Sequence, residues 1–117
     1  MSTLLGQKTE NLAKEYLIKQ GMTFLLANYR LKFGEIDLIM LDKDVIAFIE
    51  VKYRKDNNFM EAFESVNYTK QKKLKRTALY FLQANYKYQN HICRFDVITL
   101  CGSMGNLKFH WLKNAFY

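Results

Sequence analysis

The segment that decides the fold is GEIDLIMLDKDVIAFIEVKYR, residues 34–54. Two runs in it, 35–41 and 45–54, are rich in β-branched and other apolar residues, and the polar residues 42–44 between them are typical of a turn. The segment therefore predicts a β-hairpin. The two predicted strands nevertheless carry charges that an ordinary buried strand lacks. These charges belong to Glu35, Asp37, Glu50 and Lys52.

The register of the hairpin decides which of these charges lie together. Paired residues of an antiparallel hairpin have a constant index sum, so a loop with an even number of residues pairs Asp37 with Glu50. An odd loop would place them on opposite faces. Lys52 shares the face of Glu50, because side chains alternate along a strand. The even register brings the three groups together, with Cβ separations of about 5–8 Å.

Two interpretations of this charged face stay open. The first is a solvated outer face, where ion pairs contribute about 0–1 kcal/mol. The second is a functional site, because strands that are apolar on both faces are normally covered on both, and charges there are costly unless they are paired or bind a metal. Apolar residues that share the faces of the charges indicate such a cover: Ile39, Leu41, Ile46 and Phe48.

As a functional site, this face predicts a metal centre. Oxygen ligands without a nearby Cys or His favour a hard divalent cation, Mg²⁺ or Mn²⁺. Asp37 and Glu50 are the expected carboxylate ligands, and the carbonyl of Val51 can add a third. Such an ion polarises a phosphoryl oxygen and lowers the pKa of a bound water, while Lys52 is placed to orient that water and to offset charge in the transition state. This set predicts phosphodiester hydrolysis.

The rest of the chain predicts a small α/β domain that spans 1–117. Ser2 or Thr3 caps a helix that runs to about Gln20, and Glu10 sits at the border of its apolar stripe. The expected element order is α-β-β-β-α-β-β. The further predicted elements are a strand at 23–31, a short helical piece at 61–65, a helix at 69–86 and strands at 93–100 and 107–112. Asp96, which shares a strand face with Arg94, is expected to be structural.

Composition limits the classes of partner. Eighteen Lys and Arg face eleven Asp and Glu, a formal net charge of +7, which suits a polyanion and nucleic acid first. No apolar run approaches the roughly 20 residues of a membrane span, so no membrane partner is expected. The N-terminus lacks the pattern of a secretory signal, which favours the cytoplasm. Cys93 and Cys101 are expected to be free thiols there.

A basic segment, KQKKLKR at 70–76, is the predicted nucleic-acid contact. Two interpretations stay open: a track for backbone phosphates, or a solvated helix face. No element resembles a base-reading helix, so we expect recognition of backbone or shape. The candidate nucleic-acid-binding residues are Lys70, Gln71, Lys72, Lys73, Lys75, Arg76, Arg30 and Arg54.

The order of Asp37 and then Glu50-Val51-Lys52 after a short hairpin resembles the PD-(D/E)XK nuclease superfamily. More closely, GEIDLI, FIEVKYR, ENLAKEYL, SVNYTKQKKL, RFDVI and NAF together resemble the YraN-like family of predicted bacterial endonucleases, which is considered distantly similar to archaeal Holliday junction resolvases. The resemblance covers nearly the whole chain. One departure is Phe59-Met60, where relatives usually carry Phe-Gly.

The resemblance implies a restriction-endonuclease-like fold, a central mixed β-sheet flanked by helices. It implies that Asp37 and Glu50 are metal ligands, that Lys52 is the catalytic lysine, and that Glu10 is an acidic residue supplied by the first helix. Glu35 would bind a second ion or order water.

The activity implied by the resemblance is DNA endonuclease activity, with branched and single-stranded DNA among the candidate substrates. The alternatives are a nucleic-acid-binding module without turnover, and an accessory subunit that needs a homodimer or a protein partner to cut.

Overall fold

Five strands pair side by side in the order in which they occur along the chain, in a computed structural model that describes residues 3–117. Neighbouring strands are antiparallel except for β3 and β4, which are parallel. A parallel pair needs a long crossover, and two helices supply it. The strands are β1 (Thr23–Leu31), β2 (Gly34–Asp42), β3 (Val45–Arg54), β4 (Cys93–Cys101) and β5 (Lys108–Phe116).

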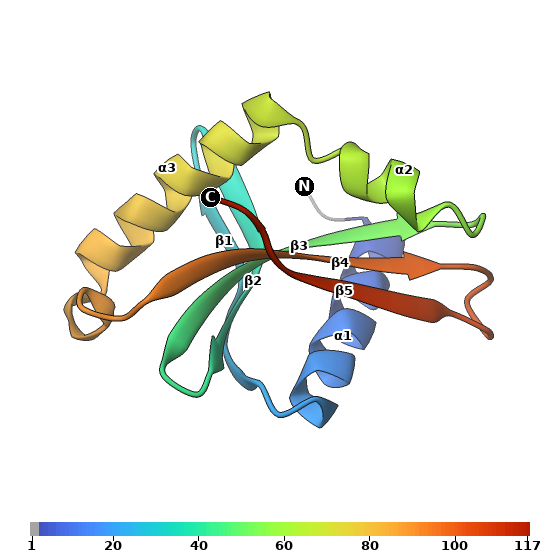
Figure 1. Cartoon of the computed structure of the whole chain (residues 1–117), viewed down its shortest axis with the longest axis horizontal. Helices are drawn as coiled ribbons and strands as arrows, with labels where there is room; N and C mark the ends of the chain where they lie inside the picture. Colours follow the sequence, from blue (N-terminus) through green and yellow to red (C-terminus); the bar gives the residue numbers. More distant parts are fainter. Residues whose placement is uncertain (1–2) are drawn as a thin grey trace.

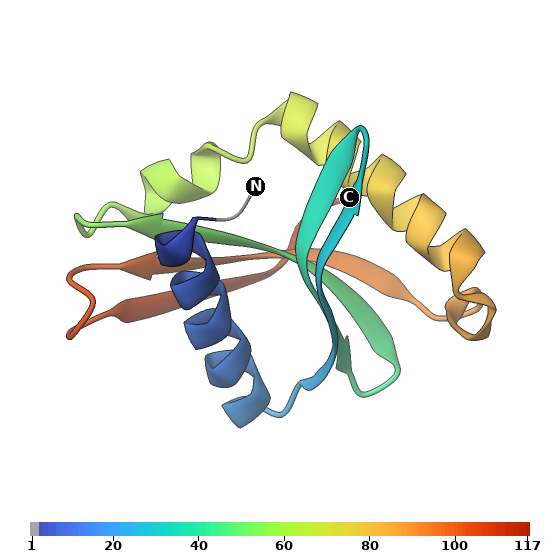
Figure 2. The same ribbon diagram turned by 180° about the vertical axis from the view of Figure 1, so that it is seen from behind.

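Helices cover both faces of this sheet (Figure 1). On one face lies α1 (Leu4–Lys19), seen in front of the sheet in Figure 2. On the other lie α2 (Phe59–Glu64) and α3 (Tyr68–Ala84), followed by the 3₁₀ turn η1 (Tyr86–Tyr88). The α1-side core contains Ala13, Leu17, Leu38, Met40, Ile49 and Ile98. The α3-side core contains Ile36, Ile39, Phe48, Leu74, Phe81 and Val97.

Capping residues set where the helices begin. Thr3 accepts a hydrogen bond of 2.9 Å from the Gly6 N–H, as predicted for the first helix, while Ser2 lies outside the described residues. Asn58 accepts from Glu61 N–H, and Asn67 accepts from Lys70 N–H, each at 3.0 Å. These two caps place the starts of α2 and α3 one or two residues before the positions that apolar periodicity predicted.

The expected element order is correct except in the crossover. Two separate helices stand where the order α-β-β-β-α-β-β has one, because α2 ends at its C-cap Ser65 and Asn67 caps the start of α3. The last strand also continues to Phe116 rather than ending at residue 112. A bulge near Asn114, whose φ is +53°, lets β5 continue past residue 112. The N–H of Asn114 donates a hydrogen bond of 3.0 Å to the buried Asp96.

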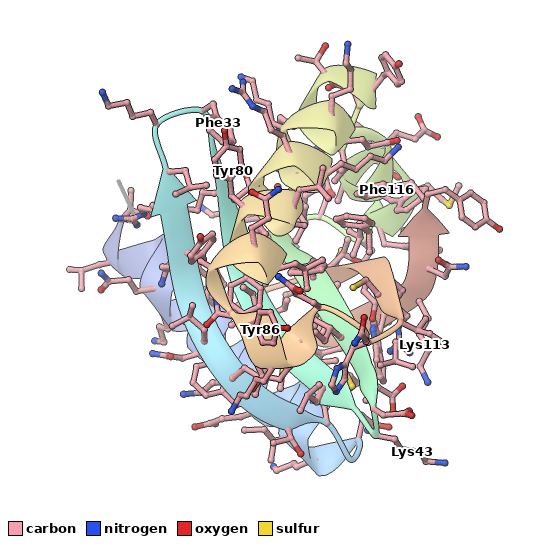
Figure 3. The ribbon with its side chains drawn as sticks, turned by 90° about the vertical axis from the view of Figure 1, so that its left-hand side faces the viewer. Phe33, Lys43, Tyr80, Tyr86, Lys113 and Phe116 are labelled. Carbon is pink, nitrogen blue, oxygen red and sulfur yellow. The ribbon has the colours of Figure 1, made fainter. Side chains whose placement is uncertain are left out.

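The β1–β2 hairpin leaves the plane of the sheet and packs on α3 (Figure 2). At Gly34 the approach is so close that a Cβ there would meet the Thr77 hydroxyl and the Lys73 carbonyl oxygen. At the hairpin tip the Phe33 ring packs 5.1 Å from that of Tyr80, and Figure 3 shows these two side chains together. The bend occurs near Asn28, whose φ is +54°. It separates the first residues of β2, before Leu38, from β3.

Within residues 3–117 no helix is long and apolar enough to cross a membrane. Cys93 and Cys101 are both free thiols, which confirms the expectation for them.

Candidate active site

Of the two hairpin registers that the sequence left open, the structure has the even one. The β2–β3 pairs run from Leu38 opposite Ile49 to Asp42 opposite Val45, which leaves a two-residue turn. Lys43 adopts a φ of +58° in that turn. The same register puts Asp37 opposite Glu50, so the two carboxylates face one another.

Asp37 lies at the point where β2 and β3 separate. The backbone pairing ends at Leu38 and Ile49, and the N–H of Val51 donates instead to Oδ2 of Asp37 at 2.8 Å. Burial raises the pKa of Asp37 to about 8, and the charge of Glu50 adds to this rise. Two carboxylates so close cannot both ionise cheaply. The pair therefore needs a shared proton or a cation.

Two lysines border this pair. The Lys52 Nζ lies 3.6 Å from Oε2 of Glu50, and both side chains are mostly buried. The close approach of Lys52, together with its charge, lowers the pKa of Lys70. Lys70 therefore reaches from the first turn of α3 to the lysine on β3. Two ammonium groups beside each other favour an anion between them.

Glu10 reaches the same place from α1, on the other face of the sheet. Burial raises the pKa of Glu10 to about 7, and the charge of Asp37 adds to the rise, whereas a hydrogen bond with Asn28 lowers it. Its Oε1 atom is buried without a hydrogen-bond partner. A small pocket of about 250 Å³ opens beside it, lined by Gln7, Glu10, Asn11, Ala27, Asn28 and Leu38. Glu10 thus lies close enough to Asp37 for their charges to interact.

Glu35 stands at the edge of the cluster. Its Oε1 pairs with the Arg30 Nε at 3.0 Å, on two side chains that are each more than a third exposed. Its charge is still near enough to contribute to the raised pKa values of Glu10 and Asp37. The ion pair with Arg30 makes Glu35 a weaker candidate ligand than Asp37 or Glu50.

The oxygen atoms available as metal ligands at this site suit a hard cation. Asp37 and Glu50 offer carboxylate oxygens, and the raised pKa of Asp37 and the partnerless oxygen of Glu10 both mark a lack of positive charge. Among the residues that the structure describes, no three His, Cys, Asp or Glu side chains form a ready metal cluster. An ion here would have two carboxylates as its protein ligands and would take its remaining ligands from water and substrate.

Comparison with known sequences places this arrangement in a family. The sequence model of the family described as Uncharacterised protein family UPF0102 matches residues 9–100. The chain belongs to this family. A UPF0102 protein of Pseudomonas putida strain F1 is 47% identical over 115 residues, which cover 97% of this chain and 94% of that protein. The matched region includes Glu10, Asp37, Glu50 and Lys52, so the YraN-like resemblance holds at the level of the family.

Similar relatives occur in other bacteria. A UPF0102 protein of Colwellia psychrerythraea strain 34H is 45% identical over 116 residues, covering 98% of this chain and 90% of its own length. One from Francisella tularensis subsp. tularensis is 44% identical over 113 residues, covering 96% and 93%. The chain therefore corresponds to nearly the full length of these relatives.

The predicted nucleic-acid-binding residues of this UPF0102 chain do not all lie at the site. Lys70 reaches it, but Gln71 donates its side-chain N–H to the Val66 carbonyl oxygen at 3.0 Å. Arg54 is bound to Asp56 at 3.0 Å and lies 3.5 Å from Glu61, toward α2.

The remaining cations of α3 spread around the helix. Lys72 lies over Tyr68 and Lys75 over Phe116, at 5.4 and 5.9 Å from the ring centroids. The Arg76 guanidinium lies 3.8 Å from the centre of the Phe33 ring and links α3 to the hairpin tip. The carbonyl of Lys73 accepts a hydrogen bond from Thr77, next to Gly34.

Sequence reasoning missed Asn28. It adopts a left-handed backbone where β1 bends, and its side chain hydrogen-bonds with Glu10. The sequence pattern that could have indicated this role is an Asn in the middle of a mostly apolar strand, because Asn is depleted in strands and tolerates a positive φ.

Proposed function

We propose that this UPF0102 chain is a Mg²⁺- or Mn²⁺-dependent endonuclease that hydrolyses phosphodiester bonds in DNA. The observation that carries the proposal is the convergence of Asp37, Glu50 and Lys52 where β2 and β3 separate, with Glu10 reaching in from α1. Paired carboxylates and a lysine at one buried point are costly to keep for stability alone.

The fold proposed with this activity is the restriction-endonuclease-like fold of the PD-(D/E)XK superfamily. Three features support it: a mixed sheet with helices on both faces, an acidic residue on β2, and an acidic residue and a lysine on β3. The β2–β3 hairpin places the motif, and β4 supports it through parallel pairing with β3.

In the proposed reaction a bound ion would polarise the scissile phosphoryl oxygen and acidify a water. Asp37 and Glu50 would hold it, and the Val51 N–H keeps the Asp37 carboxylate in place. Lys52, near Glu50, would orient the attacking water and offset charge on the phosphate. Glu10, with its partnerless oxygen, would order water beside the carboxylates.

DNA is the proposed substrate because cations surround the acidic centre. The formal net charge is +7, and Lys70 lies beside Lys52 at the mouth of the site. These ammonium groups would bind the phosphates on either side of the scissile bond, a contact that fixes position without reading sequence.

The test is a metal titration followed by cleavage. Calorimetry with Mg²⁺ or Mn²⁺ should detect a site in the wild type and little binding in Asp37→Asn or Glu50→Gln. Asp44→Asn, at an exposed turn position, is the matched control. Labelled single-stranded, duplex and four-way-junction DNA should be cut by the wild type, and Lys52→Ala should bind metal normally and lose about 10²–10³-fold in rate. Undiminished metal binding by both carboxylate variants would refute the assignment of the ligands.

A nucleic-acid-binding module without turnover is the second candidate. It is favoured by the raised pKa values of Asp37 and Glu10, about 8 and 7, because protonation near neutral pH lets the cluster persist without a cation. DNA binding that EDTA leaves unchanged, without cleavage at any metal concentration, would support it. Cleavage only at high protein concentration or with an added partner would instead indicate a homodimer or an accessory subunit.

A further inference from the structure

The face of the sheet that bears Glu50 and Lys52 continues sideways onto β4 and β5. In the β3–β4 register Glu50 pairs with Val97 and Lys52 with Thr99. In the β4–β5 register Thr99 pairs with His110. Paired residues of neighbouring strands present side chains on the same face.

Burial confirms which face this is. Ile98 and Leu100, which flank Thr99 on β4, belong to the α1-side core. The partly buried Phe109 and Trp111, which flank His110 on β5, pack against the same core. Thr99 and His110 therefore point to the opposite face, where α2 lies. With strands about 4.8 Å apart, the row from Lys52 through Thr99 to His110 extends about 10 Å from the proposed site.

A pocket of about 600 Å³ stands on this row, between α2 and the last two strands. Pockets of about 300–1,000 Å³ are typical of small-molecule sites. The rings of Phe59 and His110 stack in it, with centroids 4.2 Å apart and planes 14° from parallel. Phe59 is 38% exposed and Met60 52% exposed. Its lining includes Phe59, Met60, Phe63, Val97, Thr99 and His110.

We propose that this pocket takes an unpaired nucleobase of the strand whose phosphate lies at Glu50 and Lys52. The proposal rests on the proposed function, because that function brings a DNA phosphate to Glu50 and Lys52 on β3, next to the pocket. Single-stranded nucleic acid is held by stacking of its bases on Phe, Tyr, Trp or His beside a basic backbone track. The stacked Phe59 and His110 supply the platform, and Lys52 and Lys70 supply the charge.

The same geometry defines the substrate class. A base in a continuous duplex is covered on both sides by its neighbours and cannot enter a pocket beside its own phosphate without leaving the stack. The preferred substrate is therefore DNA with an unpaired nucleotide next to the cleavage point, such as a single strand, a flap or a branch.

The test compares a short oligothymidine with the same strand carrying a central abasic site, in Ca²⁺ and again in EDTA, so that cleavage plays no part. The wild type should bind the complete strand about tenfold more tightly. Phe59→Ala should bring that ratio close to one without changing affinity for the abasic strand. Tyr86→Ala removes an aromatic ring that is 82% exposed on η1, outside the pocket, and should leave the ratio unchanged.

A second measurement needs no variant. A strand that carries 2-aminopurine should show quenched fluorescence on binding to the wild type, with the strongest quenching at one position. Equal affinity of the wild type for the complete and abasic strands would overturn the proposal. An unchanged affinity ratio in Phe59→Ala would overturn it too. So would an apolar peptide that binds in the pocket without displacing the oligothymidine. Metal calorimetry decides the proposed function separately, so that a failed base preference with intact metal binding would refute this inference alone.

Discussion

The N–H of Val51 donates a hydrogen bond of 2.8 Å to Oδ2 of Asp37, beyond the last backbone pair of β2 and β3. The carboxylate thus replaces a backbone hydrogen bond between β2 and β3 that is lost where the β1–β2 hairpin leaves the plane of the sheet. The same side chain that ties the two strands together faces Glu50, and this position is what makes it a candidate ligand. One residue therefore links the local distortion of the sheet to the chemistry of the site.

Replacing Asp37 should separate stability from metal binding. Asp37→Asn should raise the melting temperature at pH 8 without metal by several degrees, because the amide can still accept from Val51 and no longer repels Glu50. Thermal unfolding followed by circular dichroism in EDTA measures this.

The matched control for this change is Asp42→Asn. Asp42 accepts from the Arg94 Nη1 at 2.9 Å, and this contact lowers the pKa of Asp42, so its neutralisation should lower the melting temperature. A fall in melting temperature for both variants would show that the Asp37 charge is not a source of repulsion.

The metal-free protein should lose stability as the pH rises from about 5 to 8. The folded state holds protons on Asp37 and Glu10 up to pKa values of about 8 and 7, above their ordinary values of 3.8 and 4.5. Stability from these protons is fully present below the ordinary values and is lost as the pH passes through the raised ones. Melting temperatures across this range in EDTA should fall, and the fall should be smaller in Glu10→Gln.

Added Mg²⁺ or Mn²⁺ should reverse that loss most strongly at pH 8, because the ion no longer competes with protons there. A melting temperature that rises between pH 5 and 8 in EDTA would contradict the assigned pKa shifts.

Neutralising two lysines on α3 should weaken DNA binding and flatten its dependence on salt. Lys72→Gln with Lys73→Gln should reduce the slope of log K against log salt by up to about 2 on duplex DNA, since each phosphate contact contributes about 0.9. Lys75 is left intact because it packs over the ring of Phe116. Fluorescence anisotropy over a range of NaCl concentrations measures the slope.

The matched control removes two exposed lysines elsewhere, Lys43 in the β2–β3 turn and Lys87 in η1. Figure 3 shows Lys43 at the end of the molecule opposite the start of α3. If the control pair flattens the slope as much as the α3 pair, the DNA track lies elsewhere or the effect is one of net charge alone.

Asp96 should be essential for folding and not for chemistry. It is fully buried and accepts hydrogen bonds from the Arg94 Nε, the Trp111 Nε1 and the Asn114 N–H, each at 3.0 Å. Asp96→Ala should destabilise the fold by about 3–5 kcal/mol, because it leaves the Trp111 and Asn114 donors without their partner and removes one of the two carboxylates that pair with Arg94. Trp111→Phe, which removes one donor and keeps an aromatic ring, should cost about 1 kcal/mol in urea unfolding.

Much of this could be predicted from residues that are close in sequence. The shared face of Glu50 and Lys52 and the pairing of Asp96 with Arg94 follow from the two-residue period of a strand, whereas the length of the turn, which sets the register of the hairpin, was left open. The limits of the helices were predicted less well. Caps by Asn58 and Asn67 decide where α2 and α3 start, and apolar periodicity does not encode a cap.

The sequence by itself determined the hairpin and the set of charges on it, because strand alternation and turn composition are local properties. Only the tertiary structure decided that Glu10 of α1 and Lys70 of α3 meet that hairpin, and that Phe59 of α2 stacks on His110 of β5. These contacts join elements that are far apart along the chain. They depend on the bend of β1 at Asn28 and on how the helices pack across the twisted sheet, and no local periodicity specifies either.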